Sequence, residues 1–192
     1  MLGETLITGI GQGYTQTTPL QLCLMTAQIA NGGYKIKPRI LVNNKPLSLE
    51  QAKNSMKVDS LHSPNLKLFD DPKNIKTVQE AIFSSTNEIY GTSYKSRIDD
   101  PKYQFAGKTG TSQVKRISKR ERELDLKLEQ IPYKDRDHAL YVAFGPYVNP
   151  RYALSIIVEH GGSGSKTAAP MAKELFKLII DRDELRKKQS NF

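Results

Sequence analysis

The pattern of apolar and polar positions predicts a capped helix near the start of the chain. Apolar residues recur at mostly helical spacing over residues 20–30, and the Asn-Gly-Gly sequence at 31–33 can end the helix. Thr18 can cap its first turn and Gln21 can close a capping box, with Pro19 at the first helical position. We therefore expect a helix that begins immediately after Thr18.

A second helix is predicted to begin at Asp71 and Pro72, followed by apolar residues on one face. Between the two helices, residues 34–70 show weak periodicity and several prolines, so we expect an extended and partly irregular segment. The opening stretch, residues 3–16, is rich in glycine and threonine and is predicted to be a loop.

The pattern changes to that of strands in the second half, at residues 103–114, 139–148 and 151–159. Apolar side chains occupy every second position of the third strand (Tyr152, Leu154, Ile156 and Val158). The joint at Asn149-Pro150 is short enough for an antiparallel hairpin. A glycine-rich loop at 161–164 then leads into a last helix with Met171, Leu175, Phe176, Leu178 and Ile179.

Two segments lie outside this pattern. Residues 115–138 are charged and are predicted to form a solvated insertion, partly helical, and residues 183–192 form a polar tail. The order helix, helix, three strands, helix predicts an α/β (α+β) fold in which helices flank an antiparallel sheet.

Composition narrows the possible functions only a little. The 192 residues carry a formal charge of +9, which is compatible with nucleic acid, an anionic membrane face, a polyanionic polymer, or solubility alone. In the charged insertion, acids alternate with bases and Tyr133 is the only aromatic residue, which argues against a nucleic-acid surface. Cys23 is the single cysteine and His62, His138 and His160 are far apart, so we expect no disulfide, no metal site and no cofactor.

The residues expected to carry chemistry are Lys108, Thr109 and Gly110 in the first strand. On an edge strand beside a cleft, a lysine supplies positive charge, hydroxyl groups bind a carboxylate, and backbone N–H groups can stabilise an oxyanion. Gly110 would leave the wall without a side chain, so that a substrate can lie flat against it.

The segment Phe105-Ala-Gly-Lys-Thr-Gly-Thr-Ser-Gln-Val114 resembles the third active-site motif of the penicillin-binding transpeptidases. The stretches Ile7-Thr-Gly-Ile-Gly-Gln-Gly-Tyr14 and Thr18-Pro-Leu-Gln21 are similar to class B members of that family. Three later stretches resemble its elongation-specific subgroup, penicillin-binding protein two: Arg136-Asp-His138, Ala143-Phe-Gly-Pro-Tyr147 with Asn149-Pro150, and Glu159-His-Gly-Gly162. Residues 1–192 are thus identified as the C-terminal portion of such a transpeptidase domain, with part of its β-lactamase-like fold.

The resemblance implies a role for each residue of the strand. Lys108 would act electrostatically and in proton transfer, and the backbone N–H of Thr111 would be an oxyanion donor. Thr109, Gly110 and Thr111 would bind the carboxylate end of a D-Ala-D-Ala stem peptide or of a β-lactam. The implied reaction is serine acyl transfer, in which D-alanine leaves and an amine from a neighbouring peptide resolves the acyl-enzyme.

The family also needs a Ser-x-x-Lys and a Ser-x-Asn motif before Lys-Thr-Gly. The formal matches here fail on context: Ser112-Gln-Val-Lys115 lies in the strand, Ser163-Gly-Ser-Lys166 follows it, and Ser85-Thr-Asn87 lies at a helix end without an upstream nucleophile. Ser163 also imitates the nucleophile elbow of hydrolases, but no histidine follows it. We expect the chain alone to be inactive.

Two hypotheses of different classes stay open at this point. One is a peptidoglycan D,D-transpeptidase completed by its N-terminal half, and the other is a non-catalytic remnant or structural module of a split gene. The resemblance implies the periplasmic face of the bacterial inner membrane, with attachment through an N-terminal anchor; the chain shows neither signal nor anchor. It also implies that strand 151–159 normally pairs with an N-terminal strand, so that an open edge here favours aggregation.

Overall fold

The computed structural model describes residues 2–9, 11, 13, 16–38, 66–115 and 126–190 of the chain. Its helices and strands, in chain order, are α1 (Leu2–Gly9), α2 (Pro19–Ala30), α4 (Pro72–Asn87), β1 (Ala106–Ser112), β2 (His138–Gly145), β3 (Tyr152–Val158) and α6 (Ala169–Ser190). Short 3₁₀ turns occur at Tyr94–Ser96, Leu128–Gln130 and Tyr133–Asp135, and a π-helical turn, η4, at Gly164–Ala168 precedes α6. The predicted order of helices and strands is therefore confirmed from α2 onward.

The opening segment is the clearest error of the sequence prediction, because residues 2–9 form helix α1 instead of a loop. Two of its glycines, Gly3 and Gly9, lie near the ends of the helix, where glycine costs little. The residues between them contain no helix breaker, and Glu4 lies in the first turn, where a negative charge is favourable.

The start of α2 follows its sequence signature. The amide of Gln21 donates to the Thr18 hydroxyl at 3.2 Å, and the amide of Thr18 donates to the Gln21 side chain at 2.8 Å. Asp71 caps α4 in a similar way, by accepting from the amide of Lys73 at 2.8 Å. The middle of the segment between these helices, residues 39–65, lies outside the described residues; at its ends Tyr34 and Lys67 form an isolated antiparallel bridge.

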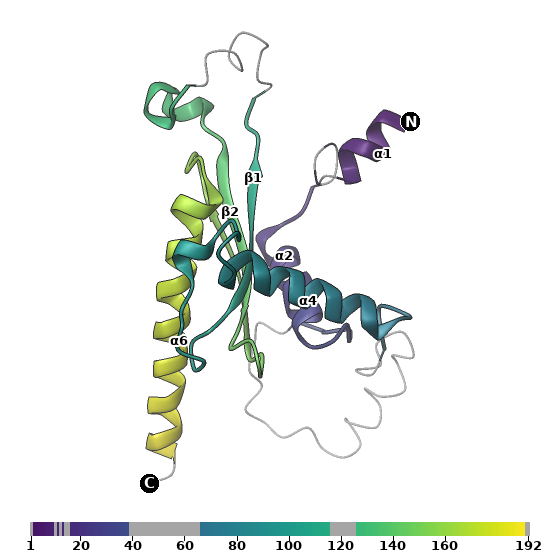
Figure 1. Ribbon diagram of the computed structural model, residues 1–192, viewed down its shortest axis with the longest axis vertical. Coiled ribbons are helices and arrows are strands. Elements are labelled where there is room, and N and C mark those ends of the chain that lie inside the picture. Colours follow the sequence, from purple (N-terminus) through teal and green to yellow (C-terminus); the bar gives the residue numbers. More distant parts are fainter. Residues whose placement is uncertain are drawn as a thin grey trace.

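The sheet is antiparallel in the order β1-β2-β3, which confirms the predicted hairpin. In the described part of the chain, β1 and β3 are thus the two edges of the sheet. Strand β2 ends at Gly145 because Pro146, which has no N–H, cannot continue the pairing. Helix α6 covers one face of the sheet, and α2 and α4 lie on the other (Figure 1).

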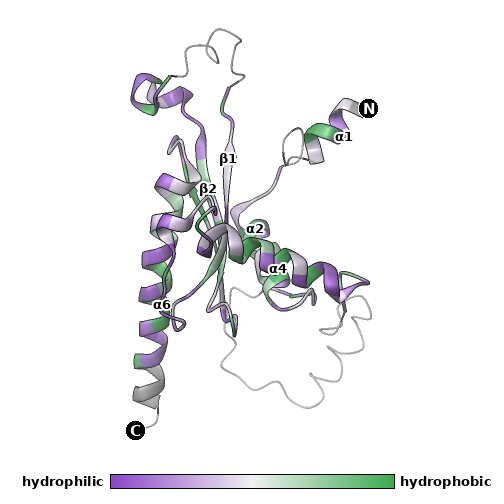
Figure 2. Ribbon diagram, in the orientation of Figure 1, coloured by the Kyte–Doolittle hydropathy of each residue, from purple (hydrophilic) through white to green (hydrophobic). Residues whose placement is uncertain are grey.

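The main core lies between the sheet and α6. Phe105 stacks on Phe176 with ring centroids 4.9 Å apart and meets Tyr141 edge-on at 6.5 Å. Small residues of β2, η4 and α6 bring the helix close to the sheet: Ala139, Ala143, Ala168, Ala169 and Ala172. Figure 2 shows how α6 alternates between polar and apolar residues, which fits a helix with one face on the core.

The predicted polar tail continues α6 as helix up to Ser190. Two groups of opposite charges hold this part of the helix against the end of the sheet. Lys102 lies 3.1 Å from Asp181 and 2.9 Å from Glu184, and Arg151 pairs with Asp183. Of the predicted insertion, residues 116–125 lie outside the described part, and its remainder contains the two later 3₁₀ turns.

Candidate active site on the edge of β1

The backbone of β1 offers its polar groups alternately to β2 and to the open edge. Gly107 is opposite Ala143, and its N–H and C=O are both bonded to the Thr86 hydroxyl of α4, each at 3.0 Å. Those two groups therefore point away from β2. Because orientation alternates along an antiparallel strand, the N–H and C=O of Thr109 and Thr111 also point outward. The sequence motif alone does not supply this parity, by which the amide of Thr111 points to the outer edge of β1.

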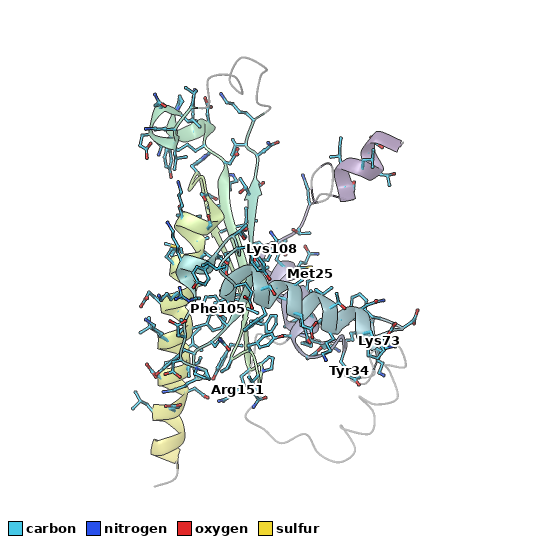
Figure 3. The ribbon with its side chains drawn as sticks, in the orientation of Figure 1. Met25, Tyr34, Lys73, Phe105, Lys108 and Arg151 are labelled. Atoms are coloured by element: carbon cyan, nitrogen blue, oxygen red, sulfur yellow. The ribbon has the colours of Figure 1, made fainter. Side chains whose placement is uncertain are left out.

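Lys108 lies beside this edge with an exposed side chain. Its Nζ donates to the carbonyl oxygen of Thr109 at 2.9 Å, so the ammonium group lies at the outer edge of the strand. Figure 3 shows Lys108 on the part of β1 that passes α4. In this exposed position, the ammonium group can form contacts with a group that lies outside the described residues.

The three residues after Lys108 differ in their surroundings. Thr109 is half-buried and Thr111 is exposed. Gly110 is approached by the chain itself: a Cβ placed on Gly164 would lie 2.7 Å from the Gly110 carbonyl oxygen. The start of η4 therefore packs closely against the backbone of Gly110. Gly164 has to be glycine because any side chain there would clash with that backbone.

A buried group of hydroxyls fixes the start of the strand. Thr86 lies 3.0 Å from the Tyr141 hydroxyl and 3.2 Å from that of Ser93, and Tyr141 lies 2.9 Å from Ser93. All three side chains are buried, and burial raises the pKa of Tyr141 above its usual value, so its proton stays available for hydrogen bonding. The position of Gly107 is thus set by side chains from α4, β2 and the turn that follows α4.

Sequence reasoning missed these residues, although one signal was present. Ser85-Thr-Asn87, a formal match to the family's second motif, contains Thr86. The structure gives all three residues roles at the junction with β1, since Asn87 donates to the Phe105 carbonyl at 2.9 Å and Ser85 Oγ lies 3.2 Å from Thr92 Oγ1.

The other two formal matches lie at the end of β1 and just before η4. Ser112 is the last residue of β1, and Lys115 lies 3.3 Å from Asp135. Ser163 Oγ lies 3.1 Å from Ser165 Oγ, just before η4, and Lys166 is exposed.

Two histidines that are far apart in the sequence, His138 and His160, lie side by side with ring centroids 4.8 Å apart. His138 Nδ1 accepts from the backbone N–H of His160 at 2.9 Å, while His62 lies outside the described residues. Over the described ranges, no three histidine, cysteine or acidic side chains are grouped so that they could hold a metal ion. In the same ranges no helix has the length and apolar character needed to cross a membrane.

The comparison with known sequences decides the family. Residues 2–177 match the penicillin binding protein transpeptidase domain. The chain belongs to the penicillin-binding protein transpeptidase family. It is 34% identical over 183 residues to the peptidoglycan D,D-transpeptidase MrdA of Salmonella typhimurium and 31% identical to that of Escherichia coli K12.

The comparison with solved structures gives the same family and the penicillin-binding protein two type. Pseudomonas aeruginosa PBP2, solved in complex with WCK 5153, superposes with a TM-score of 0.67 at 36% identity over 92% of this chain. Helicobacter pylori PBP2, solved in complex with MreC, gives a TM-score of 0.66 at 34% identity over 93% of this chain. The chain spans about a quarter of the length of the curated relatives (27% for the Salmonella protein) and 33% of the Pseudomonas chain.

Proposed function

We propose that this chain forms the Lys-Thr-Gly wall of a peptidoglycan D,D-transpeptidase and that the attacking serine comes from outside these 192 residues. The observation that carries the proposal is the orientation of β1. Its outward backbone groups at Thr109 and Thr111 lie next to the exposed ammonium group of Lys108. This arrangement suits an anionic peptide end and a developing oxyanion.

In the proposed mechanism the chain binds the acyl-D-Ala-D-Ala terminus along this edge. The hydroxyls of Thr109 and Thr111 donate to the terminal carboxylate, and the charge of Lys108 adds attraction. A serine oxygen supplied by the N-terminal part attacks the penultimate carbonyl carbon, and the Thr111 N–H donates to the resulting oxyanion. The proton of the serine hydroxyl passes, close to Lys108, to the nitrogen of the departing D-alanine as its bond to the carbonyl carbon breaks. An amine from a neighbouring stem peptide then attacks the acyl-serine ester, and the proton that the amine loses returns to the serine oxygen. A β-lactam would enter as the same kind of acyl donor.

The same proposal includes the binding partners and the cellular location of the chain. Its partners are stem peptides, β-lactams and the N-terminal half of the transpeptidase, and its location is the periplasmic face of the inner membrane, with anchoring by a segment outside the 192 residues. The relatives' names support the reaction, and the fit of this chain to penicillin-binding protein two supports its use in cell elongation and cell shape. The chain unaided is proposed to be inactive.

The proposal is tested on what we call the assembled transpeptidase: this whole chain joined to the part of Pseudomonas aeruginosa PBP2 that precedes its matching segment. A fluorescent penicillin should label the assembled transpeptidase covalently and should leave the isolated chain unlabelled. Labelling of the isolated chain would refute the external serine. A folded assembly that is never labelled would favour the remnant hypothesis.

A pair of lysine variants tests the site itself. Lys108→Ala should lower the rate of acylation by about 10²- to 10⁴-fold, the usual range for a group that takes part in proton transfer. Lys76→Ala is the matched control, because Lys76 is an exposed lysine of α4 whose partner Glu80 lies 3.8 Å away. Equal rates for the two variants would contradict the role of Lys108.

A further inference from the structure

Three hydroxyl groups lead from the end of α4 to the candidate substrate-binding edge. Ser85 Oγ lies 3.2 Å from Thr92 Oγ1, and Thr92 Oγ1 lies 3.4 Å from Thr109 Oγ1. We refer to Ser85, Thr92 and Thr109 as the hydroxyl chain. The second distance is long for a hydroxyl pair, but hydrogen bonds at active sites commonly tighten when a substrate binds.

The backbone around Thr92 is held firmly against the end of α4. Ser93 is buried, and both its N–H and its hydroxyl donate to the Ser85 carbonyl at 3.0 Å. Gly91 packs so closely that a Cβ there would lie 2.5 Å from the carbonyl oxygens of Ser84 and Ser85. Thr92 is therefore presented to β1 from a rigid turn, although its own side chain is exposed.

When an anion is bound, the donor and acceptor capacity of each hydroxyl group fixes the direction of the hydrogen bonds along the hydroxyl chain. Each hydroxyl has one proton to donate and two lone pairs to accept with. If Thr109 donates its proton to a carboxylate, Thr92 has to donate to Thr109, and Ser85 can donate to Thr92. Hydrogen bonds aligned in this way strengthen one another.

We propose that Thr92 is a positioning residue for substrate binding: its hydroxyl donates to Thr109 and thereby directs the Thr109 proton at the carboxylate of the incoming acyl donor. This inference rests on the proposed function and extends it, since it names a residue outside the Lys-Thr-Gly strand that sets selectivity for an acyl donor with a free carboxylate. Ser85 acts one step further away.

The test compares two probes on the assembled transpeptidase: a fluorescent penicillin with its free carboxylate, and the methyl ester of the same compound. The quantity measured is the ratio of their acylation rates. Thr92→Val keeps the shape of the side chain but removes the hydroxyl, and it should lower the acid-to-ester ratio about 3- to 10-fold, as the loss of one hydrogen bond predicts. Thr92→Ser, which keeps the hydroxyl, should restore the ratio.

Three further variants define the scale of the effect, its background and the contribution of the next hydroxyl. Thr109→Val should lower the ratio more, about 10- to 100-fold, because it removes a bond to a charged group. Thr77→Val is the matched control, since the Thr77 hydroxyl donates to the Lys73 carbonyl on an exposed part of α4. Ser85→Ala should lower the ratio less than Thr92→Val does.

The outcomes separate this inference from the function on which it rests. A lower ratio in Thr109→Val with an unchanged ratio in Thr92→Val overturns the positioning role and leaves the proposed function standing. Equal losses with both probes in Thr92→Val also overturn it, because a general structural defect does not distinguish acid from ester. An unchanged ratio in Thr109→Val overturns the assignment of the carboxylate site itself.

Discussion

Replacement of Gly107 by alanine tests how tightly the start of β1 is held. A Cβ at this position would lie 2.4 Å from the Tyr141 hydroxyl oxygen and 2.5 Å from the ring carbon that bears it. Tyr141 is fully buried, and its hydroxyl lies within hydrogen-bond distance of Thr86 and Ser93. The ring therefore has no open space to enter, and either β1 or Tyr141 has to move.

The expected loss can be worked out from these contacts. Overpacking of a well-filled core costs about 1–3 kcal/mol. Displacing the Tyr141 hydroxyl from its two partners adds about 0.5–1.5 kcal/mol for each bond. The strand itself favours alanine over glycine by about 0.5–1 kcal/mol, which offsets part of this cost. Gly107→Ala should thus lower the free energy of unfolding by about 2–4 kcal/mol.

The measurement is urea unfolding of the assembled transpeptidase, where such a loss lowers the midpoint by roughly 1 M or more. Gly3→Ala is the control, because a Cβ there meets nothing within 4 Å and alanine suits helix α1. A loss below about 0.5 kcal/mol for Gly107→Ala, the size of an ordinary surface change, would refute the reasoning. So would a loss equal to that of the control.

Three further outcomes are expected. Gly164→Ala should reduce acylation of the assembled transpeptidase at least about tenfold. The added Cβ would lie 2.5 Å from the Leu140 carbonyl oxygen and 2.7 Å from that of Gly110, and these backbone atoms cannot rotate away. Acylation at the wild-type rate would contradict this expectation. Partial burial raises the pKa of the Cys23 thiol, so less thiolate is present at pH 8, and the folded protein should react with a thiol reagent several-fold more slowly than the same cysteine in urea. Equal rates would count against the half-buried position. The isolated chain should associate through β3, an edge strand of the sheet in the described part of the chain, and this should appear as light scattering that the joined N-terminal part suppresses. Cooperative unfolding of a monomer would argue otherwise.

Much of the fold was predictable because its signals are local. The cap formed by Thr18 and Gln21 and the stop after Ala30 depend on residues a few positions apart, and so does the hairpin at Asn149-Pro150. The prediction of a loop is wrong at residues 2–9, because glycines near the ends of a helix give the same local signal as glycines in a loop. The sequence pattern also gives no sign that α6 continues beyond Asp183, or that Lys102 and Arg151, distant in sequence, pair with acids of that helix.

The family and the residues of the motif can be read from the amino-acid sequence, because a Lys-Thr-Gly strand with its flanking stretches is a local pattern. The direction in which that strand faces depends instead on long-range contacts. The Thr86 hydroxyl is hydrogen-bonded to both the N–H and the C=O of Gly107, so these two groups point away from β2. By alternation along the strand, the backbone groups of Thr109 and Thr111 point to the same outer edge. The Thr86 side chain contacts the backbone of Gly107 and the side chain of Tyr141, 21 and 55 positions away. Such contacts leave no periodic trace in a sequence, so the support of the site is visible only in three dimensions.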